Sequence, residues 1–563
     1  MGEFNFKSMI PITKGWSEDK KFCVTAQDDT KYLLRISSIE RFETRKALFE
    51  VLQKVSELDI PMCKPIEFGT CKDGVYTLHT WIEGQDAEDI IPMLSETEQY
   101  VLGFKSGEIL RKVHSIPAPE NQEDWYTRFN RKTNYKIQKY KECPLHFNGD
   151  DMVIKYIENN RELLKNRPQC FQNGDYHIGN MMMENGELVI IDFDRFDFGD
   201  PWEEFNRIVW CAAKSPYFAT GQLNGYFGSK PPLEFFKLLA FYIASNTLSS
   251  IYWAIPFGQS DIDTMMKQAN DVLYLYDNMQ SVVPKWYIDN FYYQYVDGVP
   301  CKLKAPFDFS FLQKYGKVFK VYDDQDSGNI YFGVQKDDKR YFVKFAGAPT
   351  ERGSVSGAEA INNLKKTKPI YRDLQHQTLI KFIDAEKIGG GFAMIFEWTD
   401  GECMGRMYPL SRRIFMSMPI DTKIKVFEDV LNFHKFVASK RYVAIDFYDG
   451  SILYDFEKEK TVICDIDFYS KIPYTNEIGR LWGSSHFMSP EEFTEGSVID
   501  EITNVHTMGA SAFALFSEYD RTLEKWTLSK SLFDVVSKAV SDDRDKRQQS
   551  ISQFIDEWNK AKE

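Results

Sequence analysis

A short polar segment of this chain is followed by an apolar run that ends at an aspartate, and the whole arrangement occurs twice. In the first copy, Asp175 precedes Asn180 by five positions, and both lie in a glycine-containing stretch. The apolar run 188–191 then leads to Asp192, 17 residues after Asp175. A short apolar run bounded by polar residues is typical of a buried strand. The segment therefore predicts one aspartate in a loop and a second at the end of a strand.

The second copy lies 271 residues further along the chain. Asp446 precedes Ser451 by five positions, and the apolar run 461–464 leads to Asp465, 19 residues after Asp446. A random loop rarely reproduces this order of residue types and spacings. The repeat therefore predicts two folded units that carry the same kind of site.

The residue types in this pattern suit phosphoryl transfer from ATP. The reaction needs a carboxylate that orients and deprotonates the acceptor hydroxyl, together with oxygen ligands that hold Mg²⁺ across the phosphates. Mg²⁺ prefers oxygen donors and retains water. We therefore expect Asp175 and Asp446 to act as bases, and Asn180, Asp192 and Asp465 to bind the metal.

Length, charge and cysteine content limit the class of protein. At 563 residues and 43% hydrophobic, the chain is too long for one core and apolar enough for two or more domains. Its net charge of −14 argues against a nucleic-acid partner, since binding to phosphate backbones needs clustered Lys and Arg. The nine dispersed cysteines indicate reduced thiols, and we expect neither a signal peptide nor a membrane-spanning segment. These features predict a cytoplasmic protein without a membrane partner.

Local patterns predict that each half begins with a small β-rich lobe and continues with a larger helical lobe. Residues 20–36 alternate as a hairpin, residues 45–58 have helical spacing, and strands are expected near 66 and over 75–81. The same order returns with a hairpin over 331–345, a helix that contains Glu359 and a strand over 393–398. The predicted division is 1–290 for the first domain, 291–315 for a connecting segment and 316–563 for the second domain.

The first half resembles the aminoglycoside phosphotransferase family, whose members share the protein-kinase-like fold. The family's loop, HGDxxxxN, is matched by Asn173-Gly174-Asp175 and by Asn180. Its metal segment, IDxxxxxxGDPxxD, is matched by Ile191-Asp192 and by Gly199-Asp200-Pro201, with Glu204 where Asp is usual. The resemblance spans roughly residues 10–290. It implies a phosphotransferase that acts on the hydroxyl of a small molecule.

In this resemblance, two residues of the first half match positions that bind ATP in the family. Arg35 stands where a lysine usually holds the α- and β-phosphates, and it keeps the charge in a longer, planar side chain. Glu50 stands at the helix-glutamate position and should pair with Arg35.

The second half looks like a divergent serine/threonine protein kinase over about residues 316–560. Lys344 corresponds to the strand lysine, with Glu359 as its expected partner and Glu351 also in range. Further correspondences are Asp446 for the loop base, Ser451 for the metal-binding Asn, Asp465-Ile466-Asp467 for DFG, Ser489-Pro490-Glu491 for APE, and Arg547 for the arginine that pairs with that glutamate. The resemblance implies α+β architecture throughout, as two tandem bilobal protein-kinase-like domains.

Two functions fit these patterns. In the first, the chain is a Mg-ATP-dependent phosphotransferase whose first domain acts on a small-molecule hydroxyl and whose second acts on a protein. In the second, the substitutions in the second loop make that domain a nucleotide-sensing pseudokinase that regulates or scaffolds the first. The acceptors, the choice of ATP over GTP and the oligomeric state are left open by the sequence.

Overall fold

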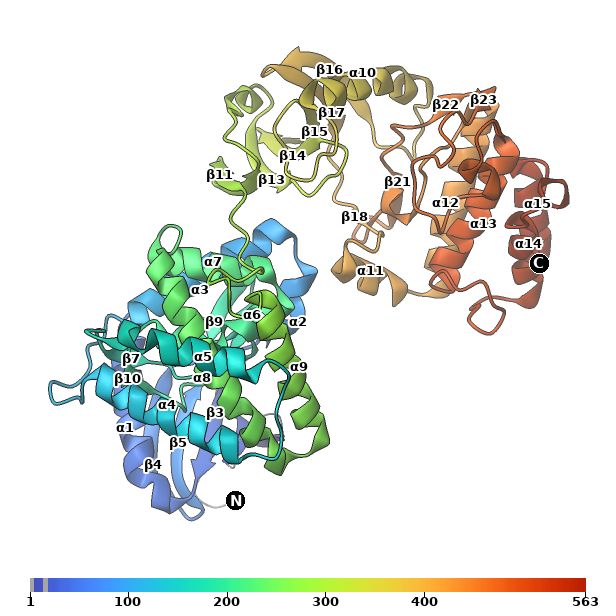
Figure 1. Cartoon of the computed structure of the whole chain (residues 1–563). Helices are drawn as coiled ribbons and strands as arrows, with labels where there is room; N and C mark the ends of the chain where they lie inside the picture. The colour runs from blue at the N-terminus through green and yellow to red at the C-terminus, as the bar shows by residue number, and fades with distance from the viewer. Residues whose placement is uncertain (1–4, 14–18, 563) are drawn as a thin grey trace. The chain divides into compact units, whose positions relative to one another are not determined.

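The computed structural model describes residues 5–13 and 19–562, and it divides the chain into two compact units (Figure 1). The first unit is Met1–Asn290 and the second is Phe291–Glu563. Separate sets of buried apolar side chains fill the two units. All nine cysteines are free thiols.

The first unit begins with an antiparallel five-stranded sheet in the order β1-β2-β3-β5-β4, with one helix between the third and fourth strands in sequence. The predicted hairpin over 20–36 is confirmed as β2 and β3. Its turn closes because Asp29 adopts a positive φ of 69° and the Asp28 carboxylate accepts a hydrogen bond from the Thr30 N–H, at 3.0 Å. The elements are β1 (Ser8–Ile12), β2 (Lys20–Thr25), β3 (Lys31–Ser37), α1 (Phe42–Ser56), β4 (Pro65–Cys71) and β5 (Gly74–Thr80).

Helices make up most of the rest of this unit, and two small sheets carry its polar loops. One sheet has the order β6-β8-β9 and the other pairs β10 with β7. The helices are α2 (Ala87–Ile90), α3 (Glu96–Val113), α4 (Trp125–Glu142), α5 (Asp150–Asn160), α6 (Ile208–Lys214), α7 (Pro216–Phe227), α8 (Leu233–Ala254) and α9 (Gln259–Leu275). The short strands are β6 (Gln85–Asp86), β7 (Cys170–Gln172), β8 (Met181–Glu184), β9 (Glu187–Ile190) and β10 (Asp197–Gly199).

Helices α3 and α7 pack with their backbones in close contact. The contact is lined by glycines four residues apart on each helix, namely Gly103 and Gly107 on α3 and Gly221 and Gly225 on α7. A Cβ atom at any of these positions would lie 1.9–2.1 Å from a carbonyl oxygen of the facing helix. No side chain larger than hydrogen fits such a gap, so the four glycines set the spacing of the two helices.

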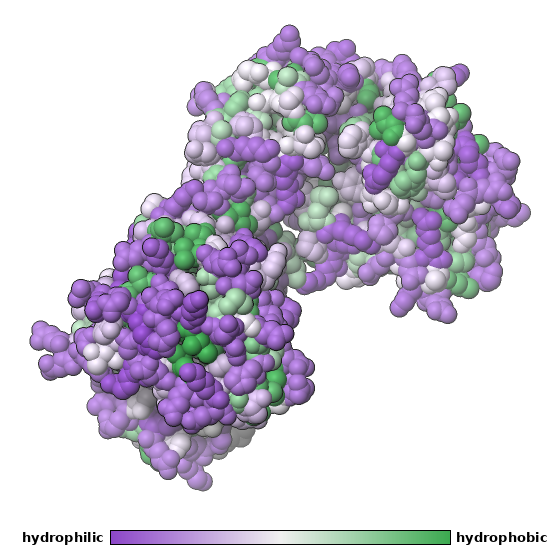
Figure 2. Space-filling model, viewed as in Figure 1, coloured by the Kyte–Doolittle hydropathy of each residue, from purple (hydrophilic) through white to green (hydrophobic). Residues whose placement is uncertain are grey.

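The helix α8 corrects the expectation that no segment has the composition of a membrane span. The helical stretch Leu233–Phe257 is long and apolar enough to cross a bilayer by length and composition alone, and residues 238–260 carry no charge. In the structure, 67% of its most apolar window is buried inside the unit. The face shown in Figure 2 is mostly hydrophilic, with hydrophobic residues in small patches. The composition of α8 is therefore that of a core helix.

The second unit repeats the sheet of the first. Its five antiparallel strands have the order β13-β14-β15-β17-β16, again with one helix between the third and fourth strands. The predicted hairpin over 331–345 is confirmed as β14 and β15. The elements are β13 (Lys317–Tyr322), β14 (Asn329–Lys336), β15 (Lys339–Ala346), α10 (Gly357–Asp373), β16 (Phe382–Ile388) and β17 (Gly391–Glu397).

Helices and further small sheets complete the second unit. The three-stranded sheet β18-β20-β21 corresponds in order to β6-β8-β9 of the first unit. The helices are α11 (Pro409–Met416), α12 (Ile420–Ser439), α13 (Glu501–Phe516), α14 (Lys530–Ala539) and α15 (Ile551–Lys562). The short strands are β18 (Glu402–Cys403), β19 (Tyr442–Val443), β20 (Ile452–Asp455), β21 (Lys460–Ile463), β22 (Ser470–Lys471), β23 (Tyr474–Thr475) and β24 (Val498–Ile499).

The segment 291–315, expected to connect two domains, is itself folded. It contains the hairpin of β11 (Tyr292–Val296) and β12 (Val299–Leu303). Cys301, Leu303 and Leu312 are buried in the same apolar cluster as the strands of the second sheet. The segment is therefore structurally part of the second unit.

Candidate active site

The loop that carries Asp175 is closed by hydrogen bonds within itself. The Asn173 carboxamide oxygen accepts from the Asp175 N–H at 3.0 Å, and the Asn180 carboxamide donates to the Asp175 carbonyl at 2.9 Å. Gly174 has a φ of +86°, and a Cβ there would lie 1.8 Å from the Arg195 carbonyl oxygen. This position requires glycine, and the loop holds Asp175 in one orientation.

Glu204 holds this loop through hydrogen bonds to its backbone. Its carboxylate accepts hydrogen bonds from the N–H groups of Gly174, at 2.9 Å, and Tyr176, at 3.4 Å, and the side chain is almost fully buried. A carboxylate at the start of a helix usually needs no further explanation, because the helix dipole favours it. The sequence allows Glu204 either as half of an acid pair with Glu203 for substrate amines or as a helix-start carboxylate. It does not reveal that two backbone N–H groups of the Asp175 loop bond to Glu204.

The Tyr176 side chain ties the same loop to the contact between α3 and α7. Its hydroxyl donates to the Ser106 carbonyl at 2.8 Å, and the Ser106 hydroxyl lies 2.9 Å from the Gln222 carboxamide that donates to it. Ser106 precedes Gly107 on α3, and Gln222 follows Gly221 on α7. The spacing of these helices therefore bears on the position of the Asp175 loop.

Asn180 and Asp192 lie side by side. The Ile191 N–H donates to the Asn180 carbonyl at 3.1 Å, and the Asn173 carboxamide donates to the Asp192 carbonyl at 3.1 Å. Asp192 adopts a positive φ of 58° and its side chain is exposed. The predicted donors are oxygens only, which is the set that Mg²⁺ prefers. In the part of the chain that the structure describes, no group of three or more His, Cys, Asp and Glu side chains could hold a metal on its own.

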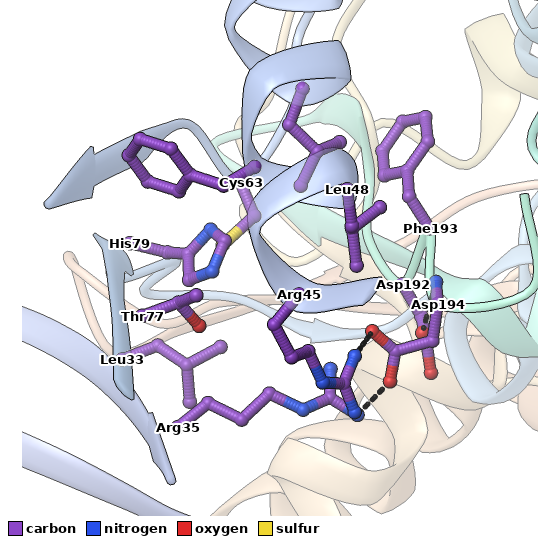
Figure 3. A pocket seen from close by; sticks show the side chains of 12 residues that line it. Leu33, Arg35, Arg45, Leu48, Cys63, Thr77, His79, Asp192, Phe193 and Asp194 are labelled. Atoms are coloured by element: carbon purple, nitrogen blue, oxygen red, sulfur yellow. Dashed lines mark hydrogen bonds and ion pairs between the residues drawn. The ribbon is translucent and has the colours of Figure 1, made fainter. Parts of the chain in front are cut away.

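Arg35 lies on β3 and binds two carboxylates. Its Nε donates to Asp19 at 2.7 Å, and its Nη2 donates to Asp194 (Figure 3). A second arginine, Arg45 on α1, bonds to the same pair: Nη1 lies 2.8 Å from Asp194, and Nη2 donates to Asp19. Both arginines and Asp194 line a cavity of about 50 Å³ that Phe193 and Asp192 also border. This cluster joins the sheet, α1 and the Asp192 segment.

The predicted pair between Arg35 and Glu50 is wrong. Glu50 is exposed on α1, and within the described residues it forms no ion pair with Arg35. The helix instead presents Arg45, only 4% exposed, to the cluster. With a cation at that position, the counter-charge comes from Asp19 and Asp194. Burial nevertheless raises the pKa of Asp194 above its usual range, in spite of the two arginines.

Three basic side chains surround the Asp175 carboxylate. Arg207 Nε lies 3.3 Å from it, His177 Nε2 lies 3.7 Å from it, and Arg195 Nε lies 3.8 Å from it. Burial lowers the pKa of His177, which favours the neutral imidazole. The sequence leaves two interpretations of His177 open, a contact with the nucleotide or acceptor and a loop histidine packed behind the base, and it does not associate either arginine with the base.

The second unit has a related cluster around Lys344 on β15. Lys344 Nζ lies 3.0 Å from Asp465 and also donates to Asp467. Tyr371, from the last turn of α10, donates its hydroxyl to Asp467 at 2.9 Å. The predicted partner Glu359 is wrong, because it is exposed at the start of α10, and among the described residues Lys344 pairs only with these two aspartates. The alternative Glu351 lies instead 3.6 Å from Lys302.

The loop of Asp446 is held in the same manner as that of Asp175. The Ser451 N–H donates to the Tyr448 carbonyl at 2.9 Å, and the Cys464 N–H donates to the Ser451 carbonyl at 2.9 Å. The corresponding bonds in the first unit are those of the Asn180 N–H and the Ile191 N–H. Asn504 anchors this loop by accepting from the Ala444 N–H at 2.8 Å and donating to its carbonyl at 2.7 Å.

Charge and burial distinguish the groups expected to react in the second unit. Burial, followed by the charges of Asp465 and Asp326, raises the pKa of Asp446 to about 7. Ser451 is fully buried, and its hydroxyl has no hydrogen-bond partner among the described residues. An unpaired buried hydroxyl is uncommon, and this oxygen fits the expected role of a weak metal ligand.

The predicted pair between Glu491 and Arg547 is confirmed. Arg547 Nη1 lies 2.7 Å from one carboxylate oxygen and Nη2 lies 3.1 Å from the other, with both side chains almost fully buried. Burial acts to raise the pKa of Glu491, but the hydrogen bonds from Arg547 outweigh it and lower the pKa to about 2. The pair locks the segment that follows Asp465 to the C-terminal helices.

Residues 8–236 match the family model described as "Phosphotransferase enzyme family". The N-terminal half therefore contains a phosphotransferase-family domain, and the expectation of a phosphotransferase enzyme is confirmed for this region. The matched range includes Arg35, Asp175, Asn180 and Asp192. No curated protein sequence matches the chain.

Solved structures similar to this chain include three with low sequence identity. One is a thermostable mutant of aminoglycoside phosphotransferase APH(4)-Ia with ADP and hygromycin B, at 14% identity and a TM-score of 0.38, covering 48% of this chain and 94% of that one. Another is the ADP-bound aminoglycoside phosphotransferase APH(2'')-Ib, at 17% identity and a TM-score of 0.35, covering 51% and 96%. The third is a choline/ethanolamine kinase family protein from Mesorhizobium loti, at 14% identity and a TM-score of 0.39, covering 50% and 92%.

Proposed function

We propose that the phosphotransferase-family domain of the first half transfers the γ-phosphoryl group of ATP to a hydroxyl of a small molecule. Asp175 orients that hydroxyl and takes its proton. Asn180 and Asp192 hold Mg²⁺, and Arg35 binds the phosphates. When bound, Mg²⁺ neutralises charge on the phosphates and aligns the γ-phosphoryl group for transfer.

One observation carries this proposal: a continuous set of contacts joins the four residues across three parts of the unit. Asn180 bonds to the Asp175 carbonyl, its own carbonyl accepts from the residue before Asp192, and Arg35 bonds to Asp194 in the same short segment. A surface-loop origin of these motifs would leave them apart. Positioning and electrostatic stabilisation are the main requirements of phosphoryl transfer, and these contacts supply both.

The test is transfer of label from γ-labelled ATP to a panel of hydroxyl compounds by the full chain, compared with its Asp175→Asn variant. Loss of a positioned base typically lowers kcat by about 10² to 10⁴. Asp263→Asn, at an exposed position on α9, is the matched control and should leave kcat unchanged. Equal rates in the wild type and Asp175→Asn, with both proteins folded, would refute the role of this site.

We further propose that the second unit is a kinase-like domain that phosphorylates a protein hydroxyl, with Asp446 as base, Lys344 on the phosphates, and Ser451 and Asp465 on Mg²⁺. The repeated strand order and the matching loop hydrogen bonds support a common architecture of the two units. A pKa of about 7 at Asp446 suits a general base near neutral pH.

The alternative for this unit is a pseudokinase that binds a nucleotide without transferring phosphate. The weak ligand Ser451 favours it. Asp446→Asn separates the two functions, because a kinase loses protein phosphorylation and a pseudokinase leaves all phosphoryl transfer unchanged. In the same experiment, Asp175→Asn should affect only the small-molecule reaction.

We also propose that the protein works in the cytoplasm, where ATP and Mg²⁺ are supplied and cysteines stay reduced. The nine free cysteines support this location.

A further inference from the structure

Two arginines beside Asp175 have unused hydrogen-bond donors. Arg195 and Arg207 approach the Asp175 carboxylate at 3.8 Å and 3.3 Å, and neither forms another ion pair with a described residue. Arg207 Nε is buried and has no hydrogen-bond partner within the described residues. An arginine carries five N–H donors in a planar fork, so most donors of both side chains remain available.

Further cations lie beyond this pair on α4. Burial and the neighbouring charge of Lys132 lower the pKa of Lys136 to about 7, while Glu203 acts to raise it and Arg207 to lower it, so all four charged side chains lie in one neighbourhood. Lys132 and Lys136 are one helical turn apart on α4 and face the same side. A lysine with that pKa is only partly protonated at neutral pH, so Arg195 and Arg207 are the permanent positive charges beside the base.

The nearby carboxylates already have partners. Glu204 is bound to two backbone N–H groups, Glu203 lies 3.3 Å from the Gln172 carboxamide, and Glu88 lies 3.4 Å from Lys214. Asp175 itself is expected to face the acceptor hydroxyl. Among the described residues, Asp175 is the carboxylate that forms an ion pair with Arg195 and Arg207.

We propose that the acceptor of the first unit is an anionic hydroxyl compound, whose carboxylate or phosphate group is bound by Arg207 and Arg195 while its hydroxyl meets Asp175. This inference rests on the proposed function and names its substrate class. Guanidinium groups bind such oxyanions through paired, charge-assisted hydrogen bonds. A polyamine such as an aminoglycoside would bring several ammonium groups against these cations and would be repelled.

The reaction on such an acceptor is a simple phosphoryl transfer. The bond between the γ-phosphorus and the β,γ-bridging oxygen breaks, and a bond forms from that phosphorus to the acceptor oxygen. The hydroxyl proton passes to Asp175, ADP leaves with the bridging oxygen, and the anionic group on Arg207 and Arg195 is unchanged.

The test uses the full chain, γ-labelled ATP and Mg²⁺ with matched acceptors. Glycerol is compared with glycerate and glycerol 3-phosphate, glucose with gluconate and glucose 6-phosphate, and kanamycin serves as the polyamine. Labelled product is measured for each compound, as is any suppression of ATP hydrolysis by compounds that bind without reacting. We expect the acidic compounds to react or to bind. Comparing the carboxylates with the phosphates shows which kind of anionic group the site accepts.

Variants then identify the residues. Arg207→Ala should raise KM for an acidic acceptor by about 10- to 100-fold, because a hydrogen bond to a charged group is lost. Arg207→Lys should restore part of the affinity. Arg131→Ala, at an exposed arginine of α4 that pairs with Glu123, is the matched control and should leave KM unchanged.

Each outcome decides the question. Labelling of kanamycin or of the neutral compounds alone would overturn this inference and keep the proposed phosphotransferase. ATP hydrolysis that no acidic compound alters would also overturn it. A rise in KM for ATP in Arg207→Ala, equal for all acceptors, would assign the arginine to the donor phosphates instead. The absence of any phosphoryl transfer, even to water, would refute the proposed function itself.

Discussion

Asp194 and Asp467 neutralise the strand cation of their own unit, and each is the second aspartate of an Asp-x-Asp segment. Asp194 bonds to Arg35 and Arg45, and Asp467 bonds to Lys344 and Tyr371. The charge that positions the cation therefore comes from the same segment as the expected metal ligand. Any movement of that segment would carry both groups with it.

Removing the Asp194 carboxylate should strongly destabilise the first unit. Asp194→Ala leaves two largely buried arginines without one of their counter-charges, and breaking a buried ion pair costs about 3–5 kcal/mol. Glu50→Ala is the matched control and should leave the free energy of unfolding unchanged. Urea denaturation of both variants measures the difference. Equal destabilisation by the two substitutions would restore Glu50 as the partner.

The strand cations and the loop aspartates could be predicted from the sequence, whereas their counter-ions could not. Arg35 and Lys344 lie within strands whose alternation is visible locally, and Asp175 and Asp446 lie in motifs of fixed spacing. Asp194, one of the two carboxylates that meet Arg35, is 159 residues away from it, and Asp465 and Asp467 are 121 and 123 residues away from Lys344. Only the folded chain brings such pairs together. Glu50 and Glu359 were chosen by their spacing, and that spacing does not report which helix face is buried.

Asp446 should make the stability of the second unit depend on pH. Its pKa is raised to about 7 in the folded chain, so between pH 4 and 7 the native state holds a proton that the unfolded state has released. The free energy of unfolding therefore falls as pH rises through this window. Asp446→Asn removes this effect. Above pH 8 its free energy of unfolding should therefore exceed that of the wild type by on the order of 3 kcal/mol. Denaturation curves at pH 5, 7 and 9 test this, and a constant difference would contradict it.

At the scale of elements, the contact between α3 and α7 depends on glycine. The spacing of Gly103 and Gly107, and of Gly221 and Gly225, is visible in the sequence. A sequence alone does not reveal which two helices such pairs bring together. The α8 helix shows the converse, because the uncharged run 238–260 is equally visible in the sequence and the burial of α8 inside the unit is not.

Gly107→Ala should force α3 and α7 apart. The new Cβ would lie 2.0 Å from the Gln222 carbonyl oxygen, and overpacking of this kind typically costs about 1–3 kcal/mol. Because Tyr176 bonds to Ser106 and Gln222 bonds to Ser106, kcat of the first unit should fall as well. Lys105→Ala, at an exposed α3 position, is the control for both measurements. If Gly107→Ala had the stability and the kcat of the wild type, the close contact of α3 and α7 would matter for neither property.

At the scale of the whole molecule, the chain contains two units that each bury their own apolar side chains. The repeated motif was enough to predict that the order of elements recurs, because that order is encoded locally in each half. The folded hairpin over residues 292–303 was not predicted, since its aromatic and proline-containing sequence lacks a clear period.

Thermal unfolding should therefore proceed in two separable transitions. Gly107→Ala should lower one midpoint and leave the other unchanged, and Asp446→Asn should shift only the second. Mg-ATP that binds both units should raise both midpoints, because a ligand stabilises the state that binds it. Differential scanning calorimetry of the full chain measures each shift. A single transition that all three changes move together would contradict independent folding of the units.

The presence of both units in one polypeptide fixes their stoichiometry. Each synthesised copy supplies one of each, whatever the level of expression, and a cell cannot adjust one against the other through transcription. Degradation that begins at an unfolded first unit would remove the second as well. A defect as small as a methyl group between α3 and α7 would therefore lower the abundance of a unit that it does not touch.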